Sequence, residues 1–326
     1  MRNLLLGTSL MALAVCAGVP ARADTPLRII FTHHSSASNP FWQSVKKGFD
    51  DACAKIQASC QMVFTQTEGS IEQQAANMQA AVARHPDALI TALADNKAFI
   101  GVLKDARKQG TIVIAANVDA TSGEELTLRQ AFIGQNFIPA GENLSRTLSK
   151  QFPRTGDLRI LVGVSAPGQN WAEQRAKGVM NGLEEFKKAN PGRKIVIDRI
   201  DSGTDGAITA DRVGAYLNLH PDTNAYFDMG LWHSSVARVL QDRGVKPGKV
   251  LMGGFDLVPQ VLQEMKAGYI QLEVDQQPYE QGFMPVMEVY LAKKAGLAPA
   301  SIDTGEALVT PDQAGAIMAL SKQGLR

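Results

Sequence analysis

The stretch Ala80-Ala81-Val82-Ala83-Arg84-His85-Pro86-Asp87 leads directly into the apolar run Ala88-Leu89-Ile90. A counterpart lies about 135 residues further on, where Gly214-Ala215-Tyr216-Leu217-Asn218-Leu219-His220-Pro221-Asp222 precedes Ala225-Tyr226-Phe227. In both places a helix-like pattern ends, and His-Pro-Asp turns the chain because proline cannot continue a helix. A buried strand is then expected to follow. An internal repeat on this scale predicts two similar lobes.

Apolar runs and amphipathic segments alternate along both halves of the chain. In the first half we expect strands at 27–32, 61–65, 88–91, 112–115 and 131–133, with helices at 40–57, 71–84 and 98–109. In the second half we expect strands at 158–164, 194–200, 225–228, 250–254 and 270–274, with helices at 171–188, 208–219, 234–242 and 258–267. Gly110 and Gly244 end equivalent helices, as glycine at a C-cap does. The pattern predicts an α/β fold of two Rossmann-like lobes with parallel sheets, joined by a hinge.

Chain length and charge narrow the class of protein further. The sequence has 326 residues, more than a single hydrophobic core usually serves, so two domains are favoured. Its 33 Lys and Arg residues balance 32 Asp and Glu residues, which predicts no nucleic-acid partner and no anionic membrane surface as partner. We expect a first lobe of residues 24–134 plus 278–304 and a second lobe of residues 135–277 plus 305–326.

The N-terminus has the pattern of a secretory signal peptide. Arg2 supplies a positive charge, residues 4–15 are mostly apolar, and Ala21-Arg22-Ala23 offers the small residues that signal peptidase requires. The segment 1–23 is too short for a stable membrane span. We therefore expect cleavage after Ala23 and export to the periplasm. Lipidation of Cys16 is the alternative, which the preceding Val15 makes less favourable.

Two cysteines remain after that cleavage. Cys53 falls late in an expected helix and Cys60 just before the next strand, so the two can meet across the helix end. An even number of cysteines in an oxidising compartment favours one disulfide. Two free buried thiols are the alternative.

Polar and aromatic residues gather where the expected strands end, which is where sheets of this kind bind ligands. They are Asn39, Phe41 and Trp42 after the first strand, Asn117 and Asp119 after the fourth, and Trp171, Arg175, Trp232, Asp256 and Gln276 in the second half. Amides, carboxylates and arginine bind hydroxyl groups, and aromatic faces cover the C–H side of a sugar ring. The set is therefore typical of a carbohydrate site. In the alternative, Phe41 and the three tryptophans are packing residues of the core or hinge.

Several short motifs follow one another in a defined order. They are Asn39-Pro40-Phe41-Trp42, then Ile133-Gly134-Gln135-Asn136 with Ala140-Gly141, then Arg175-Ala176-Lys177-Gly178, Gly254-Phe255-Asp256 and Gln276-Gln277-Pro278. The ordered set resembles the ribose-binding-protein family of periplasmic substrate-binding proteins over essentially the whole mature chain. The resemblance implies the type I fold, capture of a monosaccharide or polyol between two lobes, and delivery to an ABC importer permease at the inner membrane.

The resemblance also implies a ligand-binding role for each matching residue, and it implies neither a cofactor nor catalytic residues. Asn39 and Phe41 are expected to contact the ligand, Trp42 to stack on it, Asn117 and Arg175 to bind its oxygens, Asp256 to accept two hydroxyls, and Gln276 to supply a hinge amide. We also expect the mature protein to be a monomer.

Two departures from the family pattern bear on the ligand. Ribose binders tend to carry Asp-Arg where this chain has Asn117-Val118, and an Asn near Met229-Gly230-Leu231, so we expect a ligand other than plain ribose. A nucleoside or signalling furanose, and service to a chemoreceptor or sensor kinase, stay open as alternatives. An enzyme is disfavoured because Gly163-Val164-Ser165-Ala166-Pro167 lacks the last glycine of a nucleophile elbow. Metal binding at the adjacent His33 and His34 is also disfavoured, because they point opposite ways in an extended segment.

Overall fold

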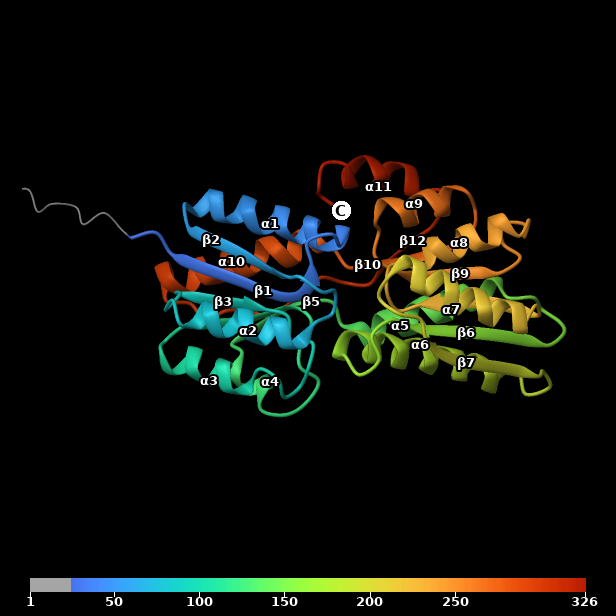
Figure 1. Ribbon diagram of the computed structural model, residues 1–326, viewed down its shortest axis with the longest axis horizontal. Coiled ribbons are helices and arrows are strands. Elements are labelled where there is room, and N and C mark those ends of the chain that lie inside the picture. The colour runs from blue at the N-terminus through green and yellow to red at the C-terminus, as the bar shows by residue number, and fades with distance from the viewer. Residues whose placement is uncertain (1–24) are drawn as a thin grey trace, which may run out of the picture.

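The computed structural model describes residues 25–326 and has two lobes that lie side by side (Figure 1). The first lobe begins with β1 (Arg28–Ser36), α1 (Pro40–Ile56), β2 (Ser59–Thr65), α2 (Ile71–Val82), β3 (Ala88–Thr91), α3 (Ile100–Lys108), β4 (Ile112–Asn117), α4 (Glu125–Leu128) and β5 (Ala131–Gly134). The second contains α5 (Phe137–Leu148), η1 (Ser149–Gln151), β6 (Leu158–Val164), α6 (Asn170–Ala189), β7 (Ile195–Asp201), α7 (Gly206–Leu219), β8 (Thr223–Asp228), α8 (His233–Asp242), β9 (Leu251–Phe255), α9 (Pro259–Lys266) and β10 (Leu272–Asp275). The chain ends with α10 (Pro278–Ala295), β11 (Ile302–Asp303), β12 (Ala307–Val309) and α11 (Ala314–Ser321). The α/β fold with a sheet in each lobe is thus as expected.

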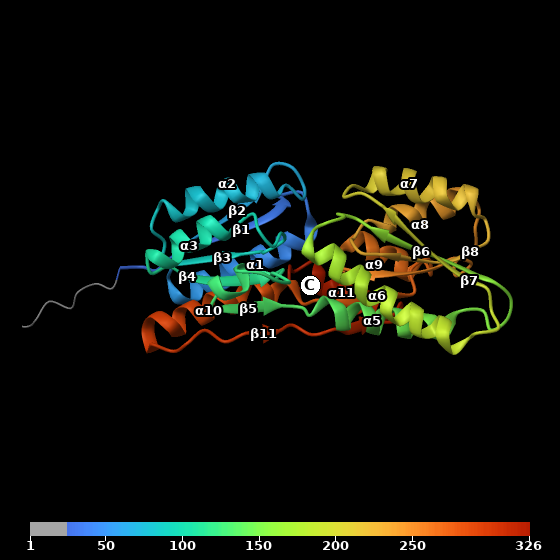
Figure 2. The same cartoon turned by 90° about the horizontal axis from the view of Figure 1, so that it is seen from below.

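Each lobe is built on a six-stranded sheet, and the pairing shows where the chain changes lobe. The strand orders are β11-β5-β4-β3-β1-β2 and β12-β10-β9-β8-β6-β7. All described pairs are parallel except β10 with β12. The chain therefore passes between the sheets after β5, after β10 and between β11 and β12. Figure 2 shows β5, α5 and β11 along one side of the molecule, with α2 and α7 on the other. This pairing supports our proposed lobe boundaries at residues 134, 277 and 304.

The first strand is longer than expected. We expected it to end at Thr32, and that was wrong, because the strand continues through His33 and His34 to Ser36. After an irregularity in the pairing, Ser36 still pairs with Thr65 of β2. The polar side chains at 33–35 suggested a loop, but they are buried in this structure and form part of the sheet.

The glycines expected to end equivalent helices have the predicted backbone conformation. Gly110 follows α3 with φ +79° and Gly244 follows α8 with φ +66°. Only glycine adopts this left-handed region without steric cost, so the chain can leave both helices at the same point of the repeat.

Glycines also let two pairs of helices touch through their backbones. A Cβ on Gly141 of α5 would lie 2.6 Å from the carbonyl oxygen of Arg175 in α6, and one on Gly178 would collide with the carbonyl of Ile138. Gly48 and Gly282 play the same part between α1 and α10 in the first lobe. The glycines that belong to the sequence motifs therefore fix α6, and with it Arg175, against the neighbouring helix.

A disulfide joins Cys53 in α1 to Cys60 in β2, with 6.2 Å between the two Cα atoms. Closing this short loop is expected to add about 2 kcal/mol to the free energy of unfolding. We expect quantitative thiol labelling of the unreduced, denatured protein to detect no free thiol. Two labelled cysteines per chain would contradict the pairing.

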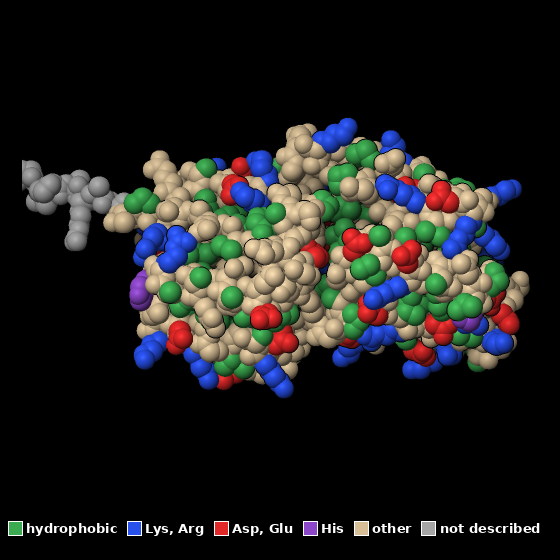
Figure 3. Space-filling view, in the orientation of Figure 1, with side chains coloured by type: hydrophobic (Ala, Val, Ile, Leu, Met, Phe, Trp, Pro, Cys, Tyr) green, Lys and Arg blue, Asp and Glu red, His purple; other side chains and the backbone are tan. Residues whose placement is uncertain are grey.

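The surface carries both signs of charge. On the face drawn in Figure 3, Lys and Arg side chains alternate with Asp and Glu over both lobes. This mixture agrees with the formal net charge of +1. Within residues 25–326, no helix is long and apolar enough to cross a membrane.

Candidate functional site

A cavity between the lobes gathers nine of the ten residues that the strand ends suggested. Its lining includes Asn39, Phe41, Trp42, Asn117, Trp171, Arg175, Trp232, Asp256 and Gln276. The empty space among these side chains, including the part that opens to solvent, is about 360 Å³. Both lobes contribute to the lining, so a molecule bound here would contact both of them.

A chain of side-chain hydrogen bonds crosses the cavity from one lobe to the other. Asn117 Nδ2 at the end of β4 donates to Gln276 Oε1 at 3.2 Å and to Gln281 Oε1 at 2.8 Å. Gln276 Nε2 in turn donates to Asp256 Oδ1. Asn117 and Asp256 have φ values of +67° and +80°, a region that Asn and Asp tolerate better than other side chains. These residue types therefore suit both the backbone and the polar network.

Arg175 is the cation of the cavity and is only 3 % exposed. Its Nη1 donates to the carbonyl oxygen of Met229 at 2.8 Å and lies 3.8 Å from Asp256 Oδ2. The guanidinium also lies 4.3 Å from the centre of the Phe255 ring. Burial lowers the pKa of Arg175, while Asp256 opposes the shift, and arginine stays charged under such conditions. Burial likewise raises the pKa of Asp256, against the effect of Arg175.

The three tryptophans differ in the surface they offer. Trp42 is 2 % exposed and stacks on His33, with 3.8 Å between ring centres, so one of its faces is covered. Trp171 Nε1 donates to Gln169 Oε1 at 2.8 Å, which fixes its ring. Trp232 is partly exposed and lies so close over Gly230 that a Cβ there would collide with its ring. A ligand can therefore meet Trp42 only at its remaining face or edge.

The lobes touch beside the cavity through the start of α6. The backbone N–H of Asn170 donates to the carbonyl oxygen of Ala94 at 2.8 Å, and its side chain donates to that of Leu93 at 2.8 Å. Gln169 Nε2 donates to the carbonyl oxygen of Gly69, also at 2.8 Å. These bonds join the second lobe to loops of the first, so the two lobes are in direct contact beside the cavity.

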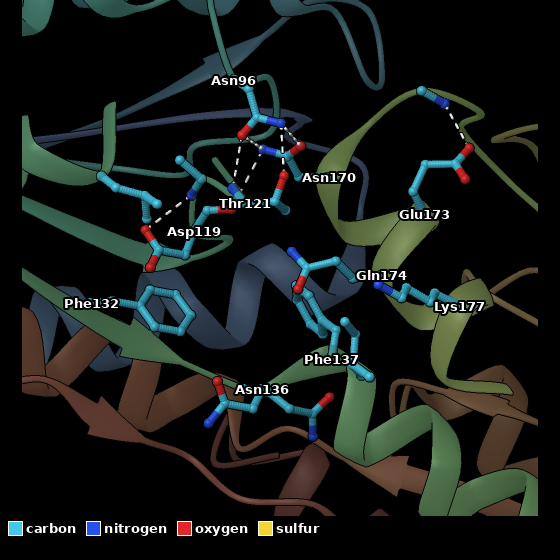
Figure 4. Close-up of a pocket in the computed structure, with 15 residues that line it drawn as sticks. Asn96, Asp119, Thr121, Phe132, Asn136, Phe137, Asn170, Glu173, Gln174 and Lys177 are labelled. Carbon is cyan, nitrogen blue, oxygen red and sulfur yellow. Dashed lines mark hydrogen bonds between the residues drawn. The ribbon is translucent and has the colours of Figure 1, made fainter. Parts of the chain in front are cut away.

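Asp119 is the residue that the structure does not bring to the cavity. It forms a bidentate pair with Arg129, with both N···O distances at 2.6 Å, and lines a second, larger groove between the lobes. Figure 4 shows this groove, with Asn96, Thr121 and Asn170 hydrogen-bonded along one wall. Burial raises the pKa of Asp119, and Arg129 opposes that shift.

Comparison with known proteins identifies the family. A family model described as "periplasmic binding protein domain" matches residues 30–296. The chain belongs to this family. The xylose/arabinose-binding protein of Sulfolobus acidocaldarius is 26% identical over 87% of this chain and 71% of its own length. The D-allose-binding periplasmic protein of Escherichia coli is 24% identical over 79% of this chain and 82% of its own. These matches confirm the resemblance found in the sequence motifs.

Solved structures of periplasmic binding proteins share the fold. An ABC transporter solute-binding protein from Burkholderia graminis, in complex with D-arabinose, has a TM-score of 0.79 and 25% identity, covering 88% of this chain and 96% of that one. A solute-binding protein from Actinobacillus succinogenes with bound D-allose has a TM-score of 0.78 at 21% identity, covering 89% and 99%. Two-lobed sugar-binding proteins are thus the structural neighbours of this periplasmic binding protein.

Five residues of the cavity lining were not among the ten candidates, namely His34, Ser35, Glu68, Gly230 and Leu231, and two of them carry polar side chains that bear on the site. Glu68, in the loop after β2, accepts hydrogen bonds from Ser35 Oγ at 2.8 Å, Ser36 N at 2.9 Å and Asn39 Nδ2 at 2.9 Å. It therefore holds the turn that presents Asn39. The same strand-end rule would have found Glu68 had it been applied to the second strand. His34 also lines the cavity, from a position expected to lie in a loop.

Behind the cavity lies a buried ionic layer in the second lobe. His233 Nε2 is 2.8 Å from Glu273 Oε1, and its Nδ1 is 3.7 Å from Asp228 Oδ2. Burial alone would lower the pKa of His233, but the two carboxylates outweigh it and raise the pKa to about 10. His233 is therefore protonated near neutral pH. Among residues 25–326, no group of three or more His, Cys, Asp or Glu side chains could hold a metal ion.

Proposed function

We propose that this periplasmic binding protein captures a neutral monosaccharide or related polyol between its lobes and delivers it to the permease of an ABC importer. The observation that carries the proposal is the amide–carboxylate chain of Asn117, Gln276 and Asp256, set among tryptophans and next to Arg175. Such a lining offers hydrogen-bond partners for several hydroxyls and aromatic surface for a sugar ring. Relatives named for xylose, arabinose and allose binding support the ligand class. The role is binding and transfer, without catalysis.

The charges of the lining favour a neutral ligand over an anionic one. Arg175 is the one cation among the described lining residues, and it faces Asp256, while Glu68 adds a second carboxylate. Burial lowers the pKa of His34 to about 4, so its ring is uncharged near pH 7. A sugar phosphate would need several cations or a free helix N-terminus.

A thermal-shift screen of the mature protein tests this function. The panel contains D-xylose, D-arabinose, D-ribose, D-allose and myo-inositol, with sugar phosphates and nucleosides as the contrasting classes. A ligand that binds only the folded state raises the free energy of unfolding by about 2.7 kcal/mol at a hundredfold excess over its Kd. We expect at least one neutral sugar or polyol to stabilise the protein. Stabilisation by sugar phosphates or nucleosides alone would overturn the proposal.

Replacing Trp232 tests whether the tryptophans that line the cavity contact the ligand. Because it is partly exposed, Trp232→Ala removes ring surface without opening a hole in the closed core. Losing an aromatic contact worth about 0.5–1.5 kcal/mol predicts an affinity loss of a few-fold to about tenfold, measured by calorimetry. Intrinsic tryptophan fluorescence should also change when the stabilising sugar is added to the wild type. Wild-type affinity in Trp232→Ala would exclude this ring from the contact.

Export and processing form a separate prediction. The expected cleavage after Ala23 lies outside the described residues, and we propose that the mature chain starts at Asp24 without a lipid. Intact mass and N-terminal sequencing of the exported protein are expected to give Asp24. A lipidated Cys16 at the new N-terminus would contradict this and make the protein membrane-anchored. Gel filtration of the mature protein is expected to show a monomer.

A further inference from the structure

His34 is held rigidly at the edge of the cavity. Its carbonyl oxygen accepts hydrogen bonds from Gly69 N at 2.8 Å and from Thr65 Oγ1 at 3.0 Å, which fix the backbone. Its ring stands edge-on to Trp42, with 5.7 Å between ring centres, and lies within 19° of parallel to Trp171. The side chain is 5 % exposed, so it has little freedom to turn elsewhere.

Two polar atoms of the cavity lining lack a partner. His34 Nδ1 and Arg175 Nε are both buried and make no hydrogen bond to any residue within 25–326. Buried polar atoms are nearly always paired in folded proteins, because an unpaired one has lost water and gained nothing. Both residues line the same cavity, which makes a bound molecule the candidate partner of the two atoms.

The two residues offer complementary chemistry. Arg175 Nε carries a hydrogen and can only donate, whereas an uncharged imidazole has one nitrogen that accepts. Burial and then the charge of Arg175 keep the pKa of His34 at about 4, so the ring is neutral near pH 7. The other ionisable groups of the described lining are Glu68 and Asp256, while His33 precedes His34 in the strand and Asp228 and Glu273 act on Arg175 from behind it. The His33 pKa is also lowered well below its usual value, mainly by burial, so it adds no charge.

We propose that His34 is a specificity-determining residue, which accepts a hydrogen bond from one ligand hydroxyl while Arg175 Nε donates to a ligand oxygen. The inference rests on the proposed function and narrows it. The preferred sugar carries a hydroxyl at the position facing His34, and its deoxy analogue is rejected because the ring nitrogen is then left unpaired. A site built to bind a hydroxyl discriminates strongly against the analogue that lacks it.

A double-mutant cycle between protein and ligand tests the proposal. The sugar used is whichever of D-xylose, D-arabinose, D-ribose and D-allose binds the wild type most tightly, together with each of its monodeoxy analogues. His34→Phe keeps a ring between the tryptophans but removes both nitrogens. His220→Phe is the matched control, because His220 packs on Tyr216 away from the cavity. We expect calorimetry to show at least tenfold weaker binding of the parent sugar to His34→Phe, and wild-type binding to His220→Phe.

The cycle also identifies the hydroxyl. One monodeoxy analogue is expected to bind the wild type about tenfold or more weakly than the parent sugar, yet to bind His34→Phe as well as the parent does. Equal affinity of wild type and His34→Phe for the parent sugar would overturn the inference while leaving the proposed function intact. A wild type that binds none of the four sugars, and no other neutral sugar or polyol of the thermal-shift panel, would overturn both.

If His34→Phe does not fold, nuclear magnetic resonance of ¹⁵N-histidine-labelled wild-type protein tests the same inference. The Nδ1 resonance of His34, assigned with His34→Gln, is expected to move when the parent sugar is added, whereas that of His220 stays in place. An unmoved His34 resonance at saturating sugar would overturn the inference.

Discussion

Replacing Asp256 with asparagine is expected to weaken sugar binding by more than tenfold. The carboxylate is 5 % exposed, accepts a hydrogen bond from Gln276 and lies 3.8 Å from the Arg175 guanidinium. A hydrogen bond to a charged group contributes about 1.5–3 kcal/mol, and each 1.4 kcal/mol is about tenfold in affinity. The substitution also leaves Arg175 with less compensation for its buried charge. Calorimetry with the sugar found in the screen measures the loss.

Asparagine is chosen so that the substitution changes ligand binding without disturbing the backbone. Asp256 has φ +80°, which asparagine tolerates and alanine does not, so Asp256→Asn changes charge with little backbone strain. The matched control is Asp119→Asn, another carboxylate just beyond a strand, which pairs with Arg129 outside the cavity. Its affinity is expected to equal that of the wild type. Wild-type affinity in Asp256→Asn, or an equal loss in both variants, would show that the cavity is not the ligand site.

Most of the residues that line the candidate site could be selected from the sequence with one rule. Proteins with parallel sheets bind ligands just past the carboxyl ends of the strands. Residues such as Asn117, Asp256 and Gln276 could therefore be selected from their positions after the expected strands. Their convergence then follows from two lobes facing each other. The same rule included Asp119, only two residues after Asn117. The backbone at Asn117 turns with φ +67°, and Asp119 then pairs with Arg129 in the neighbouring groove.

The missed residues depend on contacts between distant segments. Glu68 lies just past the second strand, where the strand-end rule selects it, but its hydrogen bonds to residues some thirty positions earlier cannot be read from the local sequence. Gln281 reaches Asn117 from α10, a helix that the sequence reasoning did not identify. His34 belongs to a strand whose polar composition suggested a loop. Local patterns predict the elements, but pairing of buried polar groups is decided in three dimensions.

Raising the pH above neutral is expected to destabilise the wild type through His233. Its pKa is about 10 in the folded protein and 6.5 for an ordinary histidine, which is the value expected after unfolding. Between these values the folded state keeps a proton that the unfolded state releases. Unfolding therefore releases a proton and becomes more favourable as the pH rises. The stabilisation is fully present below about pH 6.5 and is lost progressively towards pH 10, with a slope of up to about 1.4 kcal/mol per pH unit.

The variant His233→Gln separates this effect from all other titrations. Removing the cation leaves the buried carboxylates of Glu273 and Asp228 without the positive charge of His233, so the variant is expected to be less stable at pH 7 by about 3–5 kcal/mol. Its free energy of unfolding should fall less steeply between pH 7 and pH 10, because the group that releases the proton is gone. Urea unfolding followed by tryptophan fluorescence at several pH values gives both curves. The difference between wild type and variant should shrink as the pH rises, since the wild type then loses the positive charge on His233 that stabilises the two carboxylates. If the free energies of unfolding of wild type and variant fell in parallel with pH, His233 would be uncharged in the folded protein. The prediction would then be wrong.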